Sequence, residues 1–464
     1  MRARNPRIAR RRGPRLALGL AALAAVGGAS DRARAEIPQT RDGAGIKVGP
    51  RSTFHPGFAL LFGYDSNVFC TRPGARGGVR DAAFTTPTAW VGLGNREVRD
   101  QVLQSPIGPS ERKVDYNVRL AAGYRTFLAA DPEIRRQSRF NFTLDGHFVF
   151  APGRRFSVAV DEMLSRLAEP RNYVAGPDFN YNRIDHRGAL TLTLRPGGGR
   201  LSLSGSYLSE ALYFEAGDVF NSDRVINGAA AEVKWRFLPR SAVLARYTFH
   251  YTYYLCCQET GTGRNEDSYA HRFLAGYRGQ IGQRLVLEAL AGYGQADYIY
   301  DTITPANFKG FLGSATLSYY PTLRTHLFVQ AERAFHDSLF GNYFVDAGGR
   351  LGVAQTFRWR MYATLNLGAW ARRYEGLPVP GQDIQEIVGY NFAYGDPATS
   401  LARKDTLLTL DARLEQPLGR YFVAALRYSL SVDRTDFVIR FIDDLNDPAG
   451  FVKNIVMLLG AVRF

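Results

Sequence analysis

The chain has 464 residues, of which 45% are hydrophobic and 13% aromatic, and it contains three cysteines. Its formal net charge of +15 would suit a nucleic-acid-binding protein. However, nine of the 58 basic residues and one of the 43 acidic residues lie within the first 35 residues; without that segment the net charge is +7, which removes the main support for nucleic-acid binding.

The first 35 residues are predicted to be a secretory signal peptide. A basic stretch that ends at Arg15 is followed by the apolar segment LALGLAALAAV, and Ala33-Arg34-Ala35 offers small residues for cleavage. The apolar segment is too short to span a bilayer. We therefore expect a cleaved segment over 1–35, a short periplasmic segment over 36–50 and a folded domain over 51–464.

After this segment no run of 18 residues is apolar enough for a transmembrane helix, and a hairpin of about 40 residues recurs instead. Longer polar loops rich in Asp and Asn join the strand-like runs at one end. Short turns at one end and long loops at the other are typical of bacterial outer-membrane barrels, with the turns in the periplasm and the loops outside. The predicted turns lie at 151–155, 195–200, 238–240, 279–284, 320–324, 356–360 and 416–420.

Reading strands between these turns predicts about 18 strands, with 16 as the lower bound. The connection over 94–114 is long for a periplasmic turn, and the two longest external loops, 375–403 and 435–451, are candidates for folding into the mouth. The predicted strand centres lie near residues 58, 88, 120, 144, 160, 190, 207, 232, 248, 274, 290, 315, 330, 350, 366, 410, 427 and 458.

Apolar and polar residues alternate along many of these strands, as in 138–150, 229–237, 243–253 and 406–415. In water this pattern would suit a β-sandwich with its apolar face in a core. In an outer membrane the apolar face contacts lipid and the polar face lines a closed barrel. A sandwich would not repeat one up-and-down hairpin so many times, and a sheet in lipid must close on itself to satisfy its backbone. The sequence therefore predicts an all-β, transmembrane antiparallel β-barrel.

The stretch VGPRSTFHPGFALLFGYDSNVF, from Val48 to Phe69, resembles the opening strand of the beta-barrel porin 2 family. The likeness rests on HPGF and GYDSNVF, and it is strongest to the outer-membrane barrels found with exopolysaccharide secretion systems in bacteria such as myxobacteria. This resemblance implies a monomeric barrel that lets polysaccharide, or components of a polysaccharide machine, cross the outer membrane. Some such exporters carry a tetratricopeptide domain that is not recognised here, so a separate periplasmic partner is expected to bring the polymer.

Within this stretch Phe58, Leu60, Phe62 and Tyr64 are predicted to form the lipid face. The segment Asp65-Ser66-Asn67 that follows is most simply a rim and loop-entry motif, because these residue types hydrogen-bond locally and tolerate turns. Ion binding is the alternative for this segment.

An arginine-rich inward face is the main candidate for a functional surface. A barrel of 16 to 18 strands encloses an aqueous channel, and an excess of arginine on its wall would favour anions. The alternative is that these arginines pair with inward acids such as Asp145, Glu232, Glu288, Asp411 and Glu415 and only brace the wall. The predicted lumen-lining arginines are Arg119, Arg125, Arg139, Arg187, Arg236, Arg246, Arg278, Arg350, Arg372 and Arg427.

Aromatic residues concentrate at strand ends, as in the two interfacial girdles of membrane barrels. At the C-terminus, Phe464 follows Val462 and Leu458 on one face of the last strand. This arrangement resembles the signal that the outer-membrane barrel assembly machinery recognises. The predicted interface aromatics are Tyr64, Tyr213, Trp235, Tyr253, Tyr319 and Tyr428.

No enzymatic site is predicted. Asp145 lies near His147 and Asp185 precedes His186, but neither pair has a Ser or Cys nucleophile at a recognisable spacing. Hydrated lumen residues are the better account of both pairs. The seven histidines show no HxxxH or HExxH spacing, so no metal site and no cofactor are expected.

The cysteines Cys70, Cys256 and Cys257 lie in predicted external loops. A disulfide between Cys70 and either of the others is allowed in an oxidising compartment. It would require loops that fold across the mouth of the barrel.

Together these features predict a channel in the outer membrane of a Gram-negative bacterium that passes exported polysaccharide or other polar solutes. The expected partners are outer-membrane lipid, the barrel assembly machinery and a periplasmic polysaccharide-export protein, with no nucleic acid, and the barrel is expected to be a monomer. One alternative is a structural barrel that anchors an envelope complex for surface motility or adhesion. A general nutrient porin is the third.

Overall fold

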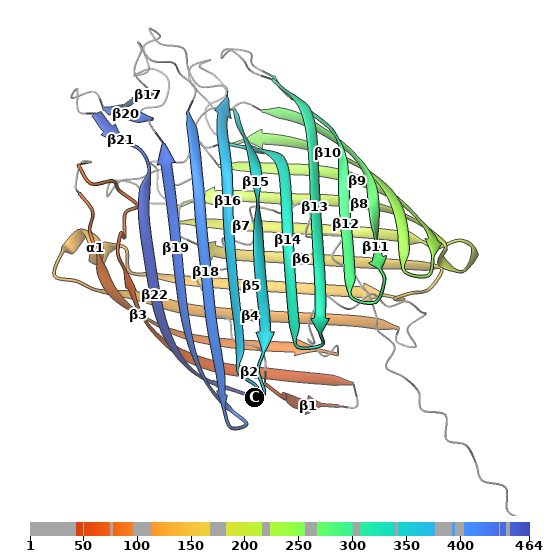
Figure 1. Ribbon diagram of the computed structural model, residues 1–464, viewed down its shortest axis with the longest axis horizontal. Helices are drawn as coiled ribbons and strands as arrows, with labels where there is room; N and C mark the ends of the chain where they lie inside the picture. The colour runs from red at the N-terminus through yellow and green to blue at the C-terminus, as the bar shows by residue number, and fades with distance from the viewer. Residues whose placement is uncertain are drawn as a thin grey trace, which may run out of the picture.

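The computed structural model shows a closed antiparallel β-barrel of eighteen long strands (Figure 1). Each long strand pairs with the next along the chain, and the last, β22 (Phe451–Arg463), pairs with the first, β2 (Ser52–Asp65). The short strand β1 (Ile46–Val48) pairs with the beginning of β2. The described residues are 43–49, 51–74, 78–95, 113–167, 182–215, 223–255, 267–299, 307–338, 342–375, 392–394, 403–435, 437–441 and 446–464.

Each predicted strand centre lies within one of the eighteen long strands, which confirms the prediction of about 18 strands. Sixteen of these strands lie between β2 and β22 in the chain. They are β3 (Ala82–Gly94), β4 (Val114–Leu128), β5 (Arg139–Phe150), β6 (Phe156–Leu167), β7 (Arg183–Leu194), β8 (Leu201–Phe214), β9 (Arg224–Leu238), β10 (Ser241–Tyr254), β11 (Ser268–Ile281), β12 (Leu285–Tyr298), β13 (Phe308–Thr322), β14 (Thr325–Asp337), β15 (Tyr343–Thr356), β16 (Tyr362–Glu375), β18 (Lys404–Leu418) and β19 (Phe422–Thr435).

The two ends of the barrel differ. All seven predicted tight turns lie at one end, here called the short-turn end. Six of them contain Pro or Gly, which favour chain reversal, whereas the turn 356–360 contains neither and places Arg360 at a φ of 62°. The long-loop end carries the helix α1 (Pro132–Arg136) and a small sheet of β17 (Phe392–Tyr394), β20 (Val438–Phe441) and β21 (Asn446–Pro448). This sheet joins the two longest loops above the ends of β19 and β22 (Figure 1).

The long connection predicted over 94–114 lies at the short-turn end between β3 and β4. At its first residue, the Asn95 side chain donates to the carbonyl of Val114 at 2.6 Å and accepts from the amide of Tyr116 at 2.9 Å. Together with the backbone bond from the Asn95 amide to the Tyr116 carbonyl at 3.1 Å, these bonds extend the β3–β4 ladder by one residue past Gly94. Residues 96–112 lie outside the described part of the chain.

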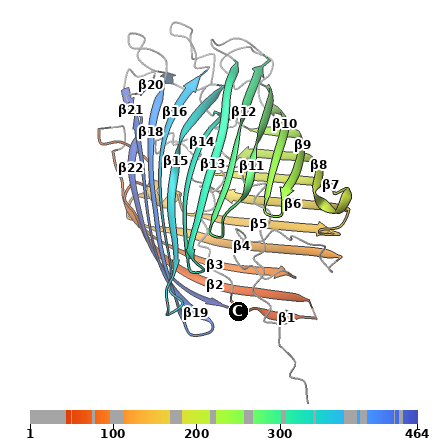
Figure 2. The same cartoon turned by 45° about the vertical axis from the view of Figure 1, so that its right-hand side comes forward.

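The alternation along the strands separates two surfaces, as expected. On β2, Phe58 and Phe62 are about half exposed on the outer surface, whereas Ala59 and Leu61 between them are buried on the inner side. The wall β10–β22 crosses the opposite wall β3–β9 steeply, as the strand tilt of a closed barrel requires (Figures 1 and 2). Among the described residues, no helix is long and apolar enough to cross a membrane.

Candidate functional site: the inner wall of the barrel

Charged side chains gather on the inner wall, and five of the ten predicted lumen arginines form ion pairs there. Four of these arginines face their acid directly across a strand pair: Arg187–Glu210, Arg246–Glu232, Arg278–Glu288 and Arg372–Asp346. The N···O distances are 3.7, 2.6, 3.3 and 2.7 Å respectively, and Arg427 lies 2.6 Å from Asp411 on the neighbouring strand. For these five arginines the geometry is that of the bracing alternative.

Four more of the predicted arginines contact rings or amides. The guanidinium of Arg119 lies 6.0 Å from the ring centre of Trp90, and that of Arg125 lies 4.8 Å from the ring of Phe84. Arg350 donates to the side-chain oxygen of Gln330 at 2.6 Å, and Arg139 donates to that of Gln137 at 3.2 Å. These rings and amides hold the four side chains against the wall, and Arg119 also lies directly opposite Asp145 on β5.

The remaining predicted arginine, Arg236, belongs to a basic cluster at the short-turn end, formed by Arg195, Lys234, Arg236 and Arg278. Lys234 and Arg195 flank Ser202 of β8, while Arg236 and Arg278 flank Ala242 of β10. In the described part of the chain, Arg278 pairs with an acid but Lys234 and Arg236 form no ion pair. The cluster therefore has more positive charge than its acidic neighbours can balance.

Arg195 stands just after β7 and is held by neutral oxygens. Its guanidinium donates to the hydroxyl of Ser157 at 2.8 Å and to the carbonyl of Arg154 at 3.2 Å. Burial lowers the pKa of Arg195, and the nearby charge of Arg236 lowers it further. Sequence reasoning missed Arg195, because it was assigned to a turn, and Lys234, because only arginines were weighed.

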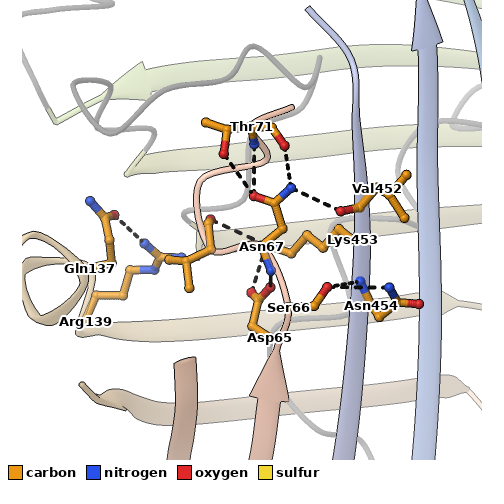
Figure 3. A network of polar contacts seen from close by, with 10 residues as sticks. Asp65, Ser66, Asn67, Thr71, Gln137, Arg139, Val452, Lys453 and Asn454 are labelled. Carbon is orange, nitrogen blue, oxygen red and sulfur yellow. Dashed lines mark hydrogen bonds and ion pairs between the residues drawn. The ribbon is translucent and has the colours of Figure 1, made fainter. Parts of the chain in front are cut away.

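At the long-loop end the motif Asp65-Ser66-Asn67 ties together the first and last strands, and the contacts between β2 and β22 are here called the closing seam (Figure 3). The buried Asp65 carboxylate lies 2.8 Å from the ammonium of Lys453. The hydroxyl of Ser66 accepts from the amide of Asn454 at 2.8 Å. The predicted loop-entry segment is thus built into the closure of the barrel.

Asn67 is fully buried at the same place, and both its side-chain nitrogen and its side-chain oxygen form hydrogen bonds (Figure 3). Its Nδ2 donates to the carbonyls of Thr71 and Val452 at 2.7 and 3.1 Å, and its Oδ1 accepts from the Thr71 amide at 2.9 Å. Its own amide donates to the Asp65 carboxylate at 3.0 Å. Local hydrogen bonding therefore accounts for this segment, and among the described residues no group of three or more His, Cys, Asp or Glu could hold a metal.

The other end of the closing seam uses the HPGF residues. The amide of Phe464 donates to the carbonyl of Pro56 at 3.1 Å, and the Phe464 ring lies 5.0 Å from that of Tyr421. A Cβ at Gly57 would lie 2.1 Å from the Trp90 ring, so only glycine fits beneath that indole. The predicted assembly residues Leu458 and Val462 lie on the outer face of β22, where Leu458 is 57% exposed.

Most predicted interface aromatics stand near strand ends, with Tyr64, Tyr213, Trp235 and Tyr319 all more than 40% exposed. Tyr253 also lies near the end of its strand, β10. Tyr428 does not: it stands in the middle of β19, where its hydroxyl donates to the Asn454 side chain at 2.7 Å. Aromatic residues are common anywhere in strands, so the residue type alone did not reveal its depth.

The two histidine pairs weighed as sites divide between the faces. His147 is inward and its Nδ1 lies 2.5 Å from Asp161 Oδ1, not beside Asp145. Asp185 is buried inside, whereas His186 faces outward with Leu190, and its Nε2 lies 2.6 Å from Glu162 Oε1. The expectation of a lumen position is therefore wrong for His186, because adjacent strand residues point to opposite faces.

Cys70 is buried in the connection after β2, with its amide donating to the carbonyl of Asn67 at 3.3 Å. Cys256 and Cys257 lie outside the described residues. The disulfide between these loops stays a prediction.

Comparisons with known proteins add little to this geometry. No model of a protein family matches the chain, and no curated protein matches it in sequence. A BenF-like porin from Pseudomonas fluorescens Pf-5 is similar in structure at TM-score 0.43 and 10% identity, covering 89% of this chain and 99% of that one. OccK9 (OpdG) of Pseudomonas aeruginosa is similar at TM-score 0.43 and 11% identity, and the match covers 89% of this chain and 98% of that one. The siderophore receptor PirA of the same organism is similar at TM-score 0.41 and 9% identity, and the match covers 90% of this chain and 81% of that one.

TM-scores this low do not establish a relationship to these proteins. The barrel fold is shown by the strand pairing itself. The resemblance of Val48–Phe69 to the beta-barrel porin 2 family stays a prediction, because no family model matches.

Proposed function

We propose that this protein is a channel of the bacterial outer membrane that conducts small polar solutes passively and prefers anions. The observation that carries the proposal is the combination of an apolar outer surface with the basic cluster Arg195, Lys234, Arg236 and Arg278 on the inner wall of a closed barrel. A sheet that closes on itself leaves neither its first nor its last strand without a partner, as lipid demands. The short-turn end would face the periplasm, as in other bacterial barrels.

The basic cluster would set the preference for anions. Cations on a low-dielectric wall raise the local concentration of anions. The five arginines paired with acids contribute little to that potential, because each ion pair is neutral as a whole. Lys234 and Arg236, without an acidic partner in the described chain, contribute most.

We propose a channel for small polar solutes rather than one for exported polysaccharide. Passage of exported polysaccharide would rest on the likeness of Val48–Phe69 alone, and the distinctive residues of that stretch already have a role in closing the barrel. Among the described residues, none favours the alternative of a structural barrel that anchors an envelope complex. The signal peptide remains a proposal, since residues 1–42 lie outside the described chain.

The test is conductance in a planar bilayer with a salt gradient across it. The wild-type reversal potential should indicate anion preference, and the preference should weaken as salt rises, because screening shortens the reach of the wall charges. The triple variant Arg195→Gln, Lys234→Gln and Arg236→Gln should bring the anion-to-cation permeability ratio close to one.

The matched control removes an ion pair rather than net charge. Arg246→Gln combined with Glu232→Gln deletes a pair with a 2.6 Å contact on the same wall and should leave selectivity unchanged. If this control shifts the reversal potential as much as the triple variant, the basic cluster is not the source of selectivity. A folded wild-type barrel without conductance would overturn the channel and favour the anchoring barrel.

A further inference from the structure

The wall of the barrel is interrupted between β13 and β14. Their pairing runs from the short-turn end up to Gly313 opposite Arg333 and stops there. Beyond that point Phe308–Leu312 pair only with β12, and Ala334–Asp337 pair only with β15. The two strands diverge toward the long-loop end (Figure 1). These two unpaired edges are here called the β13–β14 seam.

Beyond the last pair, β14 passes to the inner side of β13. Phe308 is buried on the inner face of β13, and the ring of Phe335 stacks on it at 4.3 Å between centres. The hydroxyl of Thr252 on β10 donates to the Asp337 carboxylate at 3.4 Å, although three strands separate β10 from β14 in the sheet. The end of β14 therefore lies inside the barrel, against the inner faces of β10 to β13.

The start of β15 follows β14 inward. The rings of Tyr298 and Tyr343 stack at 5.9 Å, and the hydroxyl of Tyr298 donates to the carbonyl of Asn342 at 3.2 Å. Tyr343 also meets the Phe308 ring edge-on at 5.5 Å. The hairpin end thus narrows the lumen at the long-loop end and covers the seam from within.

Aromatic packing replaces backbone pairing at the seam. An unpaired backbone group in lipid is strongly unfavourable. One of these groups is satisfied by a side chain, because Arg272 donates to the carbonyl of Phe335 at 3.2 Å. The same guanidinium lies 4.3 Å from the Phe335 ring centre. Ring contacts lack the directional constraint of a hydrogen-bond ladder, so this is the place where the wall parts most easily.

On the outer surface the seam presents an apolar side chain and a cation. Phe311 is 57% exposed there, and Arg333, at the last paired position, is also exposed on the outer side. A cation that faces lipid at mid-depth destabilises a barrel. That destabilisation disappears when the guanidinium meets a carboxylate or phosphate, which it binds strongly.

We infer that the β13–β14 seam is a lateral opening that admits an anionic amphiphile, with a carboxylate or phosphate head and an apolar chain, between the outer leaflet and the lumen. Arg333 receives the head group, and the chain enters between Phe311 outside and Phe308 and Phe335 inside. The inference rests on the membrane setting of the proposed function. It does not depend on the basic cluster at the short-turn end, so its failure leaves the anion-selective channel standing.

The test places a photo-crosslinking amino acid at Phe335, with the protein in phosphatidylglycerol vesicles. Lipid adducts are expected at Phe335 and at the outward Phe311, the positive control. None are expected at Phe84, an equally buried inward ring on β3, where the pairing with β2 and β4 continues on both sides. Because a bulky residue at 335 can prevent folding, Tyr343 serves as a second inward position.

Adducts at Phe311 without adducts at Phe335 or Tyr343 would overturn the lateral opening, as would equal labelling at Phe84. The head-group assignment is tested by lipid exchange: labelling at Phe335 should be several-fold stronger in phosphatidylglycerol than in phosphatidylcholine, and Arg333→Gln should remove that difference. Equal labelling from both lipids in the wild type would overturn the role of Arg333. Conductance measured on the same samples reports separately on the proposed channel.

Discussion

The closing seam and the β13–β14 seam each join two neighbouring strands of the barrel wall, but only the closing seam keeps its strand pairing up to the long-loop end. At the closing seam, strands from opposite ends of the chain pair from Gly57 opposite Arg463 to Asp65 opposite Ile455. At the β13–β14 seam, strands joined by a tight turn lose their pairing beyond Gly313 and Arg333. Nearness in sequence therefore does not decide which strand pair is continuous; the side chains at the end of the ladder do.

The chemistry of those side chains explains the difference. The closing seam ends in an ion pair, Asp65–Lys453, and in the buried amide of Asn67, all of which have fixed hydrogen-bond directions. The β13–β14 seam ends in stacked rings, Phe308 on Phe335, which slide at little cost. A directional contact holds two strands in register, whereas an apolar contact only keeps them close.

Breaking the ion pair of the closing seam should have the largest effect. Asp65→Leu leaves the ammonium of Lys453, whose side chain is only 12% exposed, without its carboxylate, which costs about 3 to 5 kcal/mol for a buried pair. The heat-modifiable folded barrel should be largely lost on a gel. Adding Lys453→Met should restore much of it, and a single variant with normal folding would show that this contact does not hold the seam.

The C-terminal residues test assembly at the same seam. Deleting Phe464, or replacing Val462 and Leu458 with Asp, should leave precursor in the periplasm, because the signal and the contact with Pro56 are lost together. Surface levels of heat-modifiable protein measure the outcome. Normal levels would mean that the assembly machinery does not use these residues.

Substitutions away from both seams test which residues of the continuous wall face outward and which face inward. Phe142→Lys and Leu410→Lys put a cation on the outer surface and should cost about 2 to 4 kcal/mol. Thr409→Lys, on the inner side, should be tolerated, and Thr143→Lys tests the same face at a more buried position. Urea titration of the reconstituted barrels measures the change in the free energy of unfolding. An equal loss of stability in Leu410→Lys and Thr409→Lys would contradict the assignment of faces.

The smallest effect is expected at the β13–β14 seam. Phe335→Leu keeps the side chain apolar but removes the stack on Phe308 and the contact with Arg272, a loss of about 1 kcal/mol. The free energy of unfolding measured in urea should therefore change little. A loss as large as that of Asp65→Leu would mean that the rings lock this seam as firmly as the ion pair locks the other.

Much of the fold was predictable, because it depends on local rules. A strand shows its faces through alternation, and Pro and Gly mark its turns, so the strand positions and the tight turns follow from the sequence. The pairing of Arg246 with Glu232 also lies within one hairpin. What sequence reasoning got wrong, the face of His186 and the depth of Tyr428, concerned residues judged by type rather than by their position in the alternation.

The sequence by itself determined that the chain forms an up-and-down barrel with an apolar outer surface, since period-two patterning and turn residues act over a few neighbouring positions. Only the tertiary structure decided which cations stay without an acid and where the wall opens. The contacts responsible, such as Thr252 with Asp337 and Tyr298 with Asn342, join residues that are tens of positions apart. Such contacts form only when the closed barrel brings several strands onto one inner surface, and no local pattern specifies them.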